Sequence, residues 1–119
     1  KKRVFILQLR RYKNKFWIRS ILKSNTTQNY RTAWTVVPQN PVSIEMDWKA
    51  AKSKLRQNGF IRIWVNGTIK LKKIGLNNSM LRVNEVRLGI TSPIKSLFNI
   101  SGSYYLDDFI STRLEYIGP

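Results

Sequence analysis

Carboxylates are the side chains of this sequence best suited to acid–base or metal chemistry, and there are only six of them. The chain contains no histidine and no cysteine, which removes the usual general base, the cysteine nucleophile and the thiolate zinc site. Only two close carboxylate pairs are left, Glu45/Asp47 and Asp107/Asp108. A hydrolase built on this chain would therefore need a carboxylate pair of the glycosidase kind.

The pair Asp107 and Asp108 fits a calcium site better than a catalytic site. Carboxylates together with backbone carbonyls are the ligands that Ca²⁺ prefers. In the alternative interpretation, one carboxylate accepts hydrogen bonds from loop amides and the other faces water. A structural calcium ion at Asp107 and Asp108 is the one cofactor that the sequence suggests.

The pair Glu45 and Asp47 alternates with apolar residues and so falls on the opposite face of its strand from Ile44, Met46 and Trp48. The apolar residues are expected in the core. The two acids are expected to pair with Lys and Arg on neighbouring strands. We therefore expect the protein not to be an enzyme.

Aromatic and basic residues provide a second kind of chemistry, which is binding. Trp64 is out of phase with Ile63 and Val65, which places it beside Arg62 on the outer face of its strand. Trp17 lies in the same way beside Arg19. An exposed ring on a sheet can stack on a sugar or a base, or can anchor a subunit. The candidate ligand-binding residues are Trp64, Arg62, Trp17 and Arg19, unless both sheet faces are covered.

The formal net charge of +16, from 22 Lys and Arg against six acids, predicts an anionic partner. A glycan or an anionic cell-envelope polymer is the first expectation. Nucleic acid ranks lower, because the charge is spread along the chain and no nucleic-acid-binding motif is present. The alternative is a solvated basic surface without a specific ligand.

Period-two alternation, interrupted by turn residues, predicts about eight strands and no substantial helix. Residues 5–10 and 16–21 form a hairpin around Lys13–Lys15, and residues 24–31 form a polar loop. Residues 60–65 and 69–74 flank Asn66-Gly67, a strong hairpin signal. We expect a three-residue turn with a glycine bulge, which pairs Ile63 with Leu71 and Val65 with Ile69. The other expected strands are 33–37, 42–49, 83–90 and 104–116, and residues 49–57 could form a helical turn.

These features predict one antiparallel β-sandwich domain over residues 1–119, or the C-terminal portion of one. No stretch approaches the ~20 apolar residues of a membrane-spanning helix. Four sequons fall in expected loops, at Asn25, Asn66, Asn77 and Asn99. They make glycosylation possible and favour a surface location.

Four stretches, in order, resemble the later part of a bacterial concanavalin-A-like lectin/glucanase domain of the laminin-G-like kind. They are Val42–Lys49, Phe60–Gly67, Leu76–Gly89 and Gly102–Ser111. The resemblance implies a jelly-roll sandwich that is secreted or surface-attached and often lacks enzymatic activity. Domains of this family usually have further strands before this region. The sandwich is therefore expected to be incomplete, or to be completed by missing N-terminal strands or a neighbouring chain. The family is also commonly neutral or acidic, unlike this chain.

The functional expectation is a non-catalytic, extracellular or cell-surface module that binds glycans or anionic envelope polymers. One alternative is a structural subunit of an extracellular fibre or lattice. Such a homo-oligomer would assemble through open strand edges, with the strand of Phe5, Leu7 and Leu9 as donor or acceptor. A second alternative is a basic nucleic-acid-associated protein.

Overall fold

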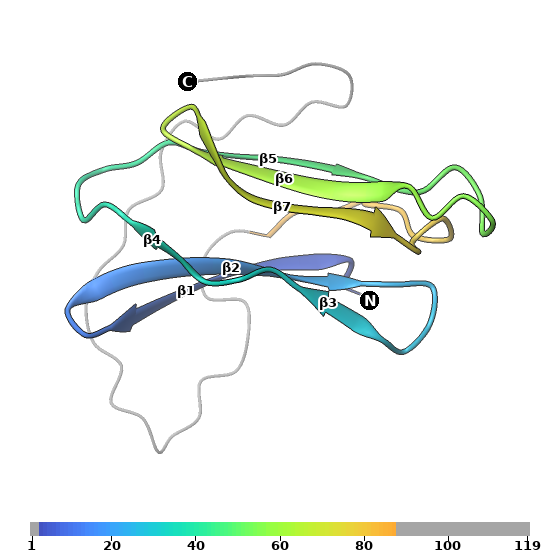
Figure 1. Cartoon of the computed structure of the whole chain (residues 1–119), viewed down its shortest axis with the longest axis horizontal. Helices are drawn as coiled ribbons and strands as arrows, with labels where there is room; N and C mark the ends of the chain where they lie inside the picture. Colours follow the sequence, from blue (N-terminus) through green and yellow to red (C-terminus); the bar gives the residue numbers. More distant parts are fainter. Residues whose placement is uncertain (1–2, 88–119) are drawn as a thin grey trace.

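Alternating apolar and polar residues build two stacked antiparallel sheets in the computed structural model, which describes residues 3–87 (Figure 1). Sheet A contains β1 (Phe5–Tyr12), β2 (Lys15–Lys23), β3 (Asn29–Arg31) and β4 (Thr35–Val37). Sheet B contains β5 (Ile44–Lys49), β6 (Gly59–Val65) and β7 (Thr68–Leu76). Residues 3–87 contain no helix, so the predicted all-β antiparallel sandwich is confirmed.

Sheet A is organised around β2, which pairs with β1 on one side and with both β3 and β4 on the other. Between these two short strands the chain stays joined to β2 through Thr32. The Thr32 hydroxyl accepts a 2.8 Å hydrogen bond from the backbone N–H of Ser20, and the Thr32 N–H donates to the Ser20 carbonyl at 3.0 Å. The buried backbone of β2 is thereby satisfied where the neighbouring ladder is interrupted.

The β1–β2 hairpin closes through a two-residue turn at Lys13-Asn14, with Tyr12 opposite Lys15. Both turn residues have positive φ, 51° and 60°. Two consecutive left-handed residues match the right-handed twist of the flanking strands. The turn was expected at this place, and Asn14 takes the backbone conformation that its residue type tolerates.

The β6–β7 hairpin corrects the predicted register in part. Its turn is the two-residue Asn66-Gly67, with φ of 50° and 79°, and it places Val65 opposite Thr68. The expected pair Val65–Ile69 is therefore wrong, because a bulge lies further along the hairpin instead of in the turn. Trp64 pairs with Ile69 and Ile63 pairs with Leu71, so Lys70 is the extra residue. The expected pair Ile63–Leu71 is confirmed.

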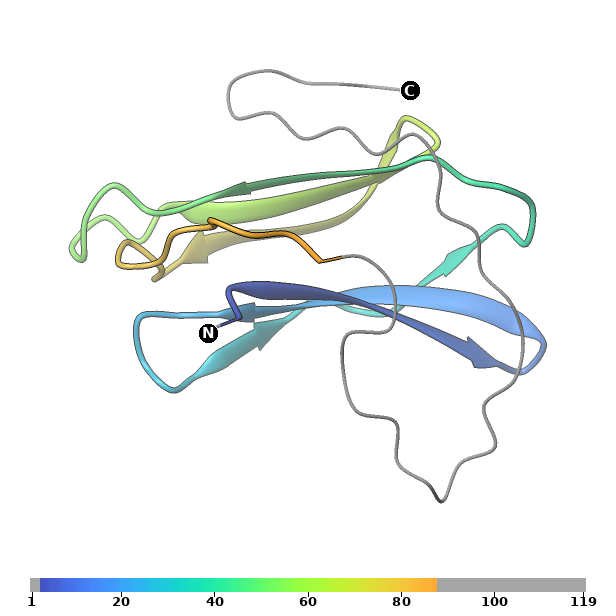
Figure 2. The ribbon, with the colours of Figure 1, turned by 180° about the vertical axis from the view of Figure 1, so that it is seen from behind.

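The two sheets stack face to face (Figure 2), and the core between them contains residues of β2, β4, β6 and β7. Most of its fully buried members come from β2 and β6, which are paired on both sides. They are Ile18, Leu22, Ile61 and Ile63, and Leu76 at the end of β7 is also fully buried. Phe5 of β1 contacts Trp48 of β5, with ring centroids 6.3 Å apart, and so connects the two sheets at that side.

The expected core placement of the β5 residues is wrong in part. Ile44 and Met46 lie opposite Val65 and Ile63 on the inward face, but they remain 39% and 38% exposed. The physical reason is that β5 lies at the edge of the three described strands of sheet B, where the facing sheet covers it incompletely. Trp48 is half-buried and packs against the core, as predicted.

Three other predictions also need correction. The expected polar loop 24–31 contains β3, because Tyr30 pairs with Leu22 and packs against the core. Residues 50–58 form bends and irregular chain rather than a helical turn. Residues 83–87 are not in a strand, while residues 88–90 and the expected strand 104–116 lie outside the described residues.

The chain directly after β7 is held by hydrogen bonds that belong to no ladder. The Met80 N–H donates to Asn25 Oδ1 at 2.8 Å, and the Leu81 N–H donates to the Asn78 carbonyl at 3.1 Å. Asn25 also donates through Nδ2 to Asn77 Oδ1 and Ser79 Oγ, both at 3.0 Å. These bonds fix the loop after β2 to the loop after β7, and so join the two sheets at one end.

Asn78, in the loop after β7, is a buried polar residue with no exposed surface. Its Oδ1 accepts a 2.7 Å hydrogen bond from the Ala51 N–H, and its Nδ2 donates to the Lys49 carbonyl at 3.3 Å. Gly59 provides the space, since a Cβ at that position would lie 1.9 Å from Asn78 Oδ1. One side chain therefore positions the segment after β5 against the start of β6.

We expect Asn78→Ala to lower the free energy of unfolding by about 2 to 3 kcal/mol, because it leaves a buried N–H without an acceptor. Urea denaturation measures the difference. Asn40→Ala, at an exposed loop position, is the control, with an expected change within about 0.5 kcal/mol. Equal stabilities of Asn78→Ala and Asn40→Ala would contradict the role given to Asn78.

Candidate anion-binding surface

The outward face of sheet A carries basic and aromatic side chains on adjacent strands. Pairing of Leu7 with Ser20 and of Leu9 with Ile18 directs those residues towards the core face. The intervening residues therefore point outward, and they include Gln8, Arg10 and Tyr12 from β1 and Trp17, Arg19 and Ile21 from β2. The same alternation that fills the core thus collects these side chains on one surface.

Trp34 organises two of the arginines on this face. The guanidinium carbon of Arg10 lies 4.2 Å from the centre of the Trp34 ring, and that of Arg19 lies 4.5 Å from it. Both are within the range of cation–π attraction. Trp34 is half-buried and directly precedes β4, whose pairing with β2 fixes its position. One indole ring therefore holds two guanidinium groups close together.

A third arginine extends the group across the sheet. Arg31 of β3 lies opposite Ile21, which places it diagonally across from Arg19 on the outward face. Burial, followed by the charges of Arg31 and Arg10, lowers the pKa of Arg19 below its ordinary value. Arg19 remains charged near neutral pH, because the ordinary pKa of arginine is far above it. The contributions of Arg31 and Arg10 to this lowering have the direction expected for like charges close to Arg19. We call Arg10, Arg19, Arg31 and Trp34 the arginine row.

No carboxylate within residues 3–87 neutralises the arginine row. The acids of this range are Glu45, Asp47 and Glu85, and none of them belongs to sheet A. Among the described residues, the hydrogen bond made by the row is donated by Arg19 Nε to Gln8 Oε1 at 2.8 Å, and the glutamine side chain is neutral. A guanidinium group can donate two parallel hydrogen bonds to one oxyanion. Arginines that have no acidic partner can therefore bind an anionic ligand.

Tyr12 and Trp17 border the row at the hairpin end of sheet A. The Tyr12 ring is 50% exposed, and it has Arg10 and Lys13 at 5.2 and 5.5 Å from its centre. Trp17 is half-buried, and its Nε1 donates a 3.1 Å hydrogen bond to the Tyr12 carbonyl. The aromatic rings of this face are thus engaged with cations or with the backbone.

The outward face of sheet B has a different electrostatic character. The guanidinium of Arg62 lies 4.5 Å from the Phe60 ring centre and 5.5 Å from that of Trp64. Arg62 also forms an ion pair with Asp47, its cross-strand neighbour. A carboxylate therefore neutralises the arginine here, as expected for Asp47, whereas no described acid lies on the sheet that carries the arginine row.

The structure separates the four predicted binding residues into two pairs. Trp17 and Arg19 lie on the outward face of sheet A, while Arg62 and Trp64 lie on the outward face of sheet B, on the opposite side of the sandwich. They do not form one site. Sequence reasoning omitted Arg10, Arg31 and Trp34 from the site, because their proximity depends on β2 pairing with both β3 and β4, which the alternation of single strands does not indicate. Period-two phase indicates which face a residue occupies, but not which residues meet there.

The remaining candidates fall in several places. Asp107, Asp108 and Asn99 lie outside the described residues. Asn25 and Asn77 bind each other in the connection between the sheets, and Asn66 lies exposed in the β6–β7 turn. Across residues 3–87, no three acidic side chains converge in a way that could hold a metal ion. In the same range, no helix has the length and apolar character to cross a membrane.

Comparison with protein-family models, curated proteins and solved structures finds no match to this chain. The resemblance to concanavalin-A-like domains consequently stays a prediction. The features that bear on function are the charges and aromatic rings of the two outward faces.

We expect Asp47→Asn to lower the free energy of unfolding by less than about 1 kcal/mol, because both partners of the Arg62–Asp47 pair are more than one third exposed. Thermal or urea unfolding at low and high salt measures this. A loss well above that amount would show that the pair supports sheet B, instead of mainly setting the charge of its outward face.

Proposed function

We propose that the protein is a non-catalytic β-sandwich module that binds an anionic glycan or envelope polymer across the arginine row of sheet A. The observation that carries the proposal is the pair of guanidinium groups held at one indole ring, with a third arginine on the neighbouring strand and no carboxylate in the four described strands of the sheet. An extracellular or cell-surface location is part of the proposal, because such polymers occur there.

A polymer suits this surface better than a small ligand does. The row crosses three neighbouring strands, β1, β2 and β3, and further cations of the same sheet continue the positive charge beyond it. They are Lys15 and Lys23 on the outward face and Lys13 in the turn between β1 and β2. An extended anionic chain can contact several such charges at once, and the summed field raises its local concentration and its association rate.

Glycan is favoured over single-stranded nucleic acid by the state of the aromatic rings. Sequence-tolerant nucleic-acid binding depends on open rings on which bases stack. Here Trp34 is engaged by two arginines, and Tyr12 by Arg10 and Lys13. The face instead offers guanidinium donors, which serve hydrogen bonding to carboxylate, sulfate or phosphate groups.

The triple variant Arg10→Gln/Arg19→Gln/Arg31→Gln tests the proposal. We expect it to weaken binding of dextran sulfate or polygalacturonate by about 10- to 100-fold at 50 mM salt, since three exposed charge contacts of about 0.5 to 1 kcal/mol each are lost. Isothermal titration calorimetry at several salt concentrations gives the affinity. The dependence of affinity on salt should also become shallower, because fewer charges are screened.

The matched control is Lys52→Gln/Lys54→Gln/Arg56→Gln, which removes the same charge from an exposed segment between β5 and β6. A general charge effect would weaken both triple variants equally, and that outcome would overturn the proposal. Single-stranded RNA of equal length is the second comparison. If RNA binds more tightly than both polysaccharides, the module is a nucleic-acid-binding protein instead.

Trp34 is expected to act as a positioning residue for the two arginines. Trp34→Phe keeps an aromatic face and should retain most of the affinity, whereas Trp34→Ala should lose about three- to tenfold, with no change in charge. Affinity for dextran sulfate and the circular dichroism of both variants are the measurements. Equal affinity of Trp34→Ala and the unaltered protein would show that the ring does not organise the row.

A further inference from the structure

The bulge in the β6–β7 hairpin gives Lys70 an unusual position. In a regular two-residue hairpin, Lys70 would pair with Ile63 and point to the core face. The bulge instead brings Leu71 opposite Ile63 and leaves Lys70 as the inserted residue, at the end of the sandwich. Leu71 is buried, while the lysine is exposed.

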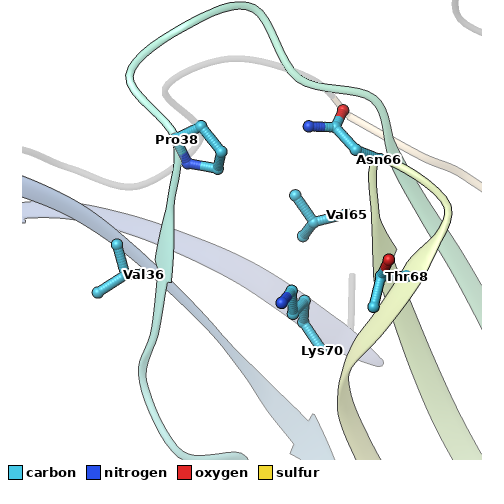
Figure 3. A pocket seen from close by; sticks show the side chains of 6 residues that line it. All are labelled: Val36, Pro38, Val65, Asn66, Thr68 and Lys70. Carbon is cyan, nitrogen blue, oxygen red and sulfur yellow. The ribbon is translucent and has the colours of Figure 1, made fainter.

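Lys70 borders a cavity of about 410 Å³ between the hairpin and β4 (Figure 3). Lys70, Thr68, Asn66 and Val65 line it from the hairpin, and Val36 and Pro38 line it from the other sheet. Figure 3 shows the amine of Lys70 directed towards the space between Val36 and Val65. A volume of this size is in the range of sites for small molecules.

The polar groups of the cavity are donors without partners. Asn66 uses its Oδ1 to accept a 2.9 Å hydrogen bond from the Ser43 N–H, which directs its Nδ2 donor away from that bond. Within the described part of the chain, Asn66 Nδ2, the Thr68 hydroxyl and the Lys70 amine form no hydrogen bond or ion pair. One cation and two neutral donors therefore face a wall made of Val36, Pro38 and Val65.

We propose that this cavity binds the carboxylate of a small ring-bearing acid, of the uronic-acid class. A single ammonium balances the single charge of a carboxylate, and the amide and hydroxyl supply donors for its oxygens. The apolar wall suits the C–H face of a sugar ring. The site is separate from the arginine row and does not depend on the function proposed above.

The experiment is a titration of ¹⁵N-labelled full-length protein with galacturonate, and with galactose as the matched ligand that lacks the carboxylate. Galacturonate is expected to shift the backbone amides of Asn66, Thr68 and Lys70, while galactose leaves them unchanged. Lys70→Gln should weaken galacturonate binding by about tenfold. Lys72→Gln, on the outward face of sheet B opposite Arg62, is the control and should bind as the unaltered protein does.

Two further arms make the result decisive. Polygalacturonate tests whether the carboxylate comes from a free acid or from a chain. If the monomer shifts the cavity amides, the site binds a free acid or a terminal residue of a chain. If only the polymer shifts them, and Lys70→Gln abolishes those shifts, the site binds an internal residue of a chain. The triple variant of the arginine row should bind galacturonate at the cavity unchanged. The proposal is overturned if galactose causes the same shifts, if Lys70→Gln binds galacturonate normally, or if only the amides of the arginine row respond.

Discussion

The strict alternation of β2 is the constraint on which the rest of the molecule depends. Its inward positions include Ile18, Ser20 and Leu22, all buried, while its outward positions carry Trp17 and Arg19. Because side chains of a strand point alternately to opposite faces, core packing on one side fixes the arginine on the other. A register slip of one residue would exchange the two sets, so the stability of the sandwich and the geometry of the arginine row depend on the same pairing.

The uneven distribution of carboxylates gives the two outward faces different properties. On sheet B, Asp47 pairs with Arg62 across β5 and β6, and this places opposite charges side by side. On sheet A, Arg10, Arg19 and Arg31 lie close together with no acid among the described residues of the sheet, and burial, followed by the charges of Arg31 and Arg10, lowers the pKa of Arg19. Cation–π contacts of Arg10 and Arg19 with the Trp34 ring offset part of the repulsion between the charges. A bound polyanion would relieve the repulsion, and it would therefore stabilise the folded state by mass action.

Much of the fold could be predicted from the sequence, since it depends on local patterns. Alternation identified strands at 5–10, 16–21, 42–49 and 60–65, and Asn14 and Asn66-Gly67 identified both tight turns. The errors have physical causes that lie outside local patterns. Edge position leaves Ile44 exposed, the pairing of Tyr30 with Leu22 places a strand in the expected loop, and the bulge lies at Lys70 instead of in the turn. The faces of Trp17 and Trp64 were predictable, but the proximity of Arg10, Arg19 and Trp34 was not, because it depends on the pairing of β4 with β2.

The two candidate sites share one structural origin, which is irregularity at the end of a regular ladder. Trp34 meets the arginines because the neighbour of β2 is divided into β3 and β4, with the chain between them held by Thr32. Lys70 borders the cavity because one residue is inserted in β7. Regular pairing of the strands stabilises the fold because it buries one face of each sheet. Where the pairing is interrupted by a bulge or a break, a side chain can take a position that regular alternation would not give it. Chemical specificity in this sandwich is therefore best sought at its interruptions, with the ladders serving as the rigid support that positions them.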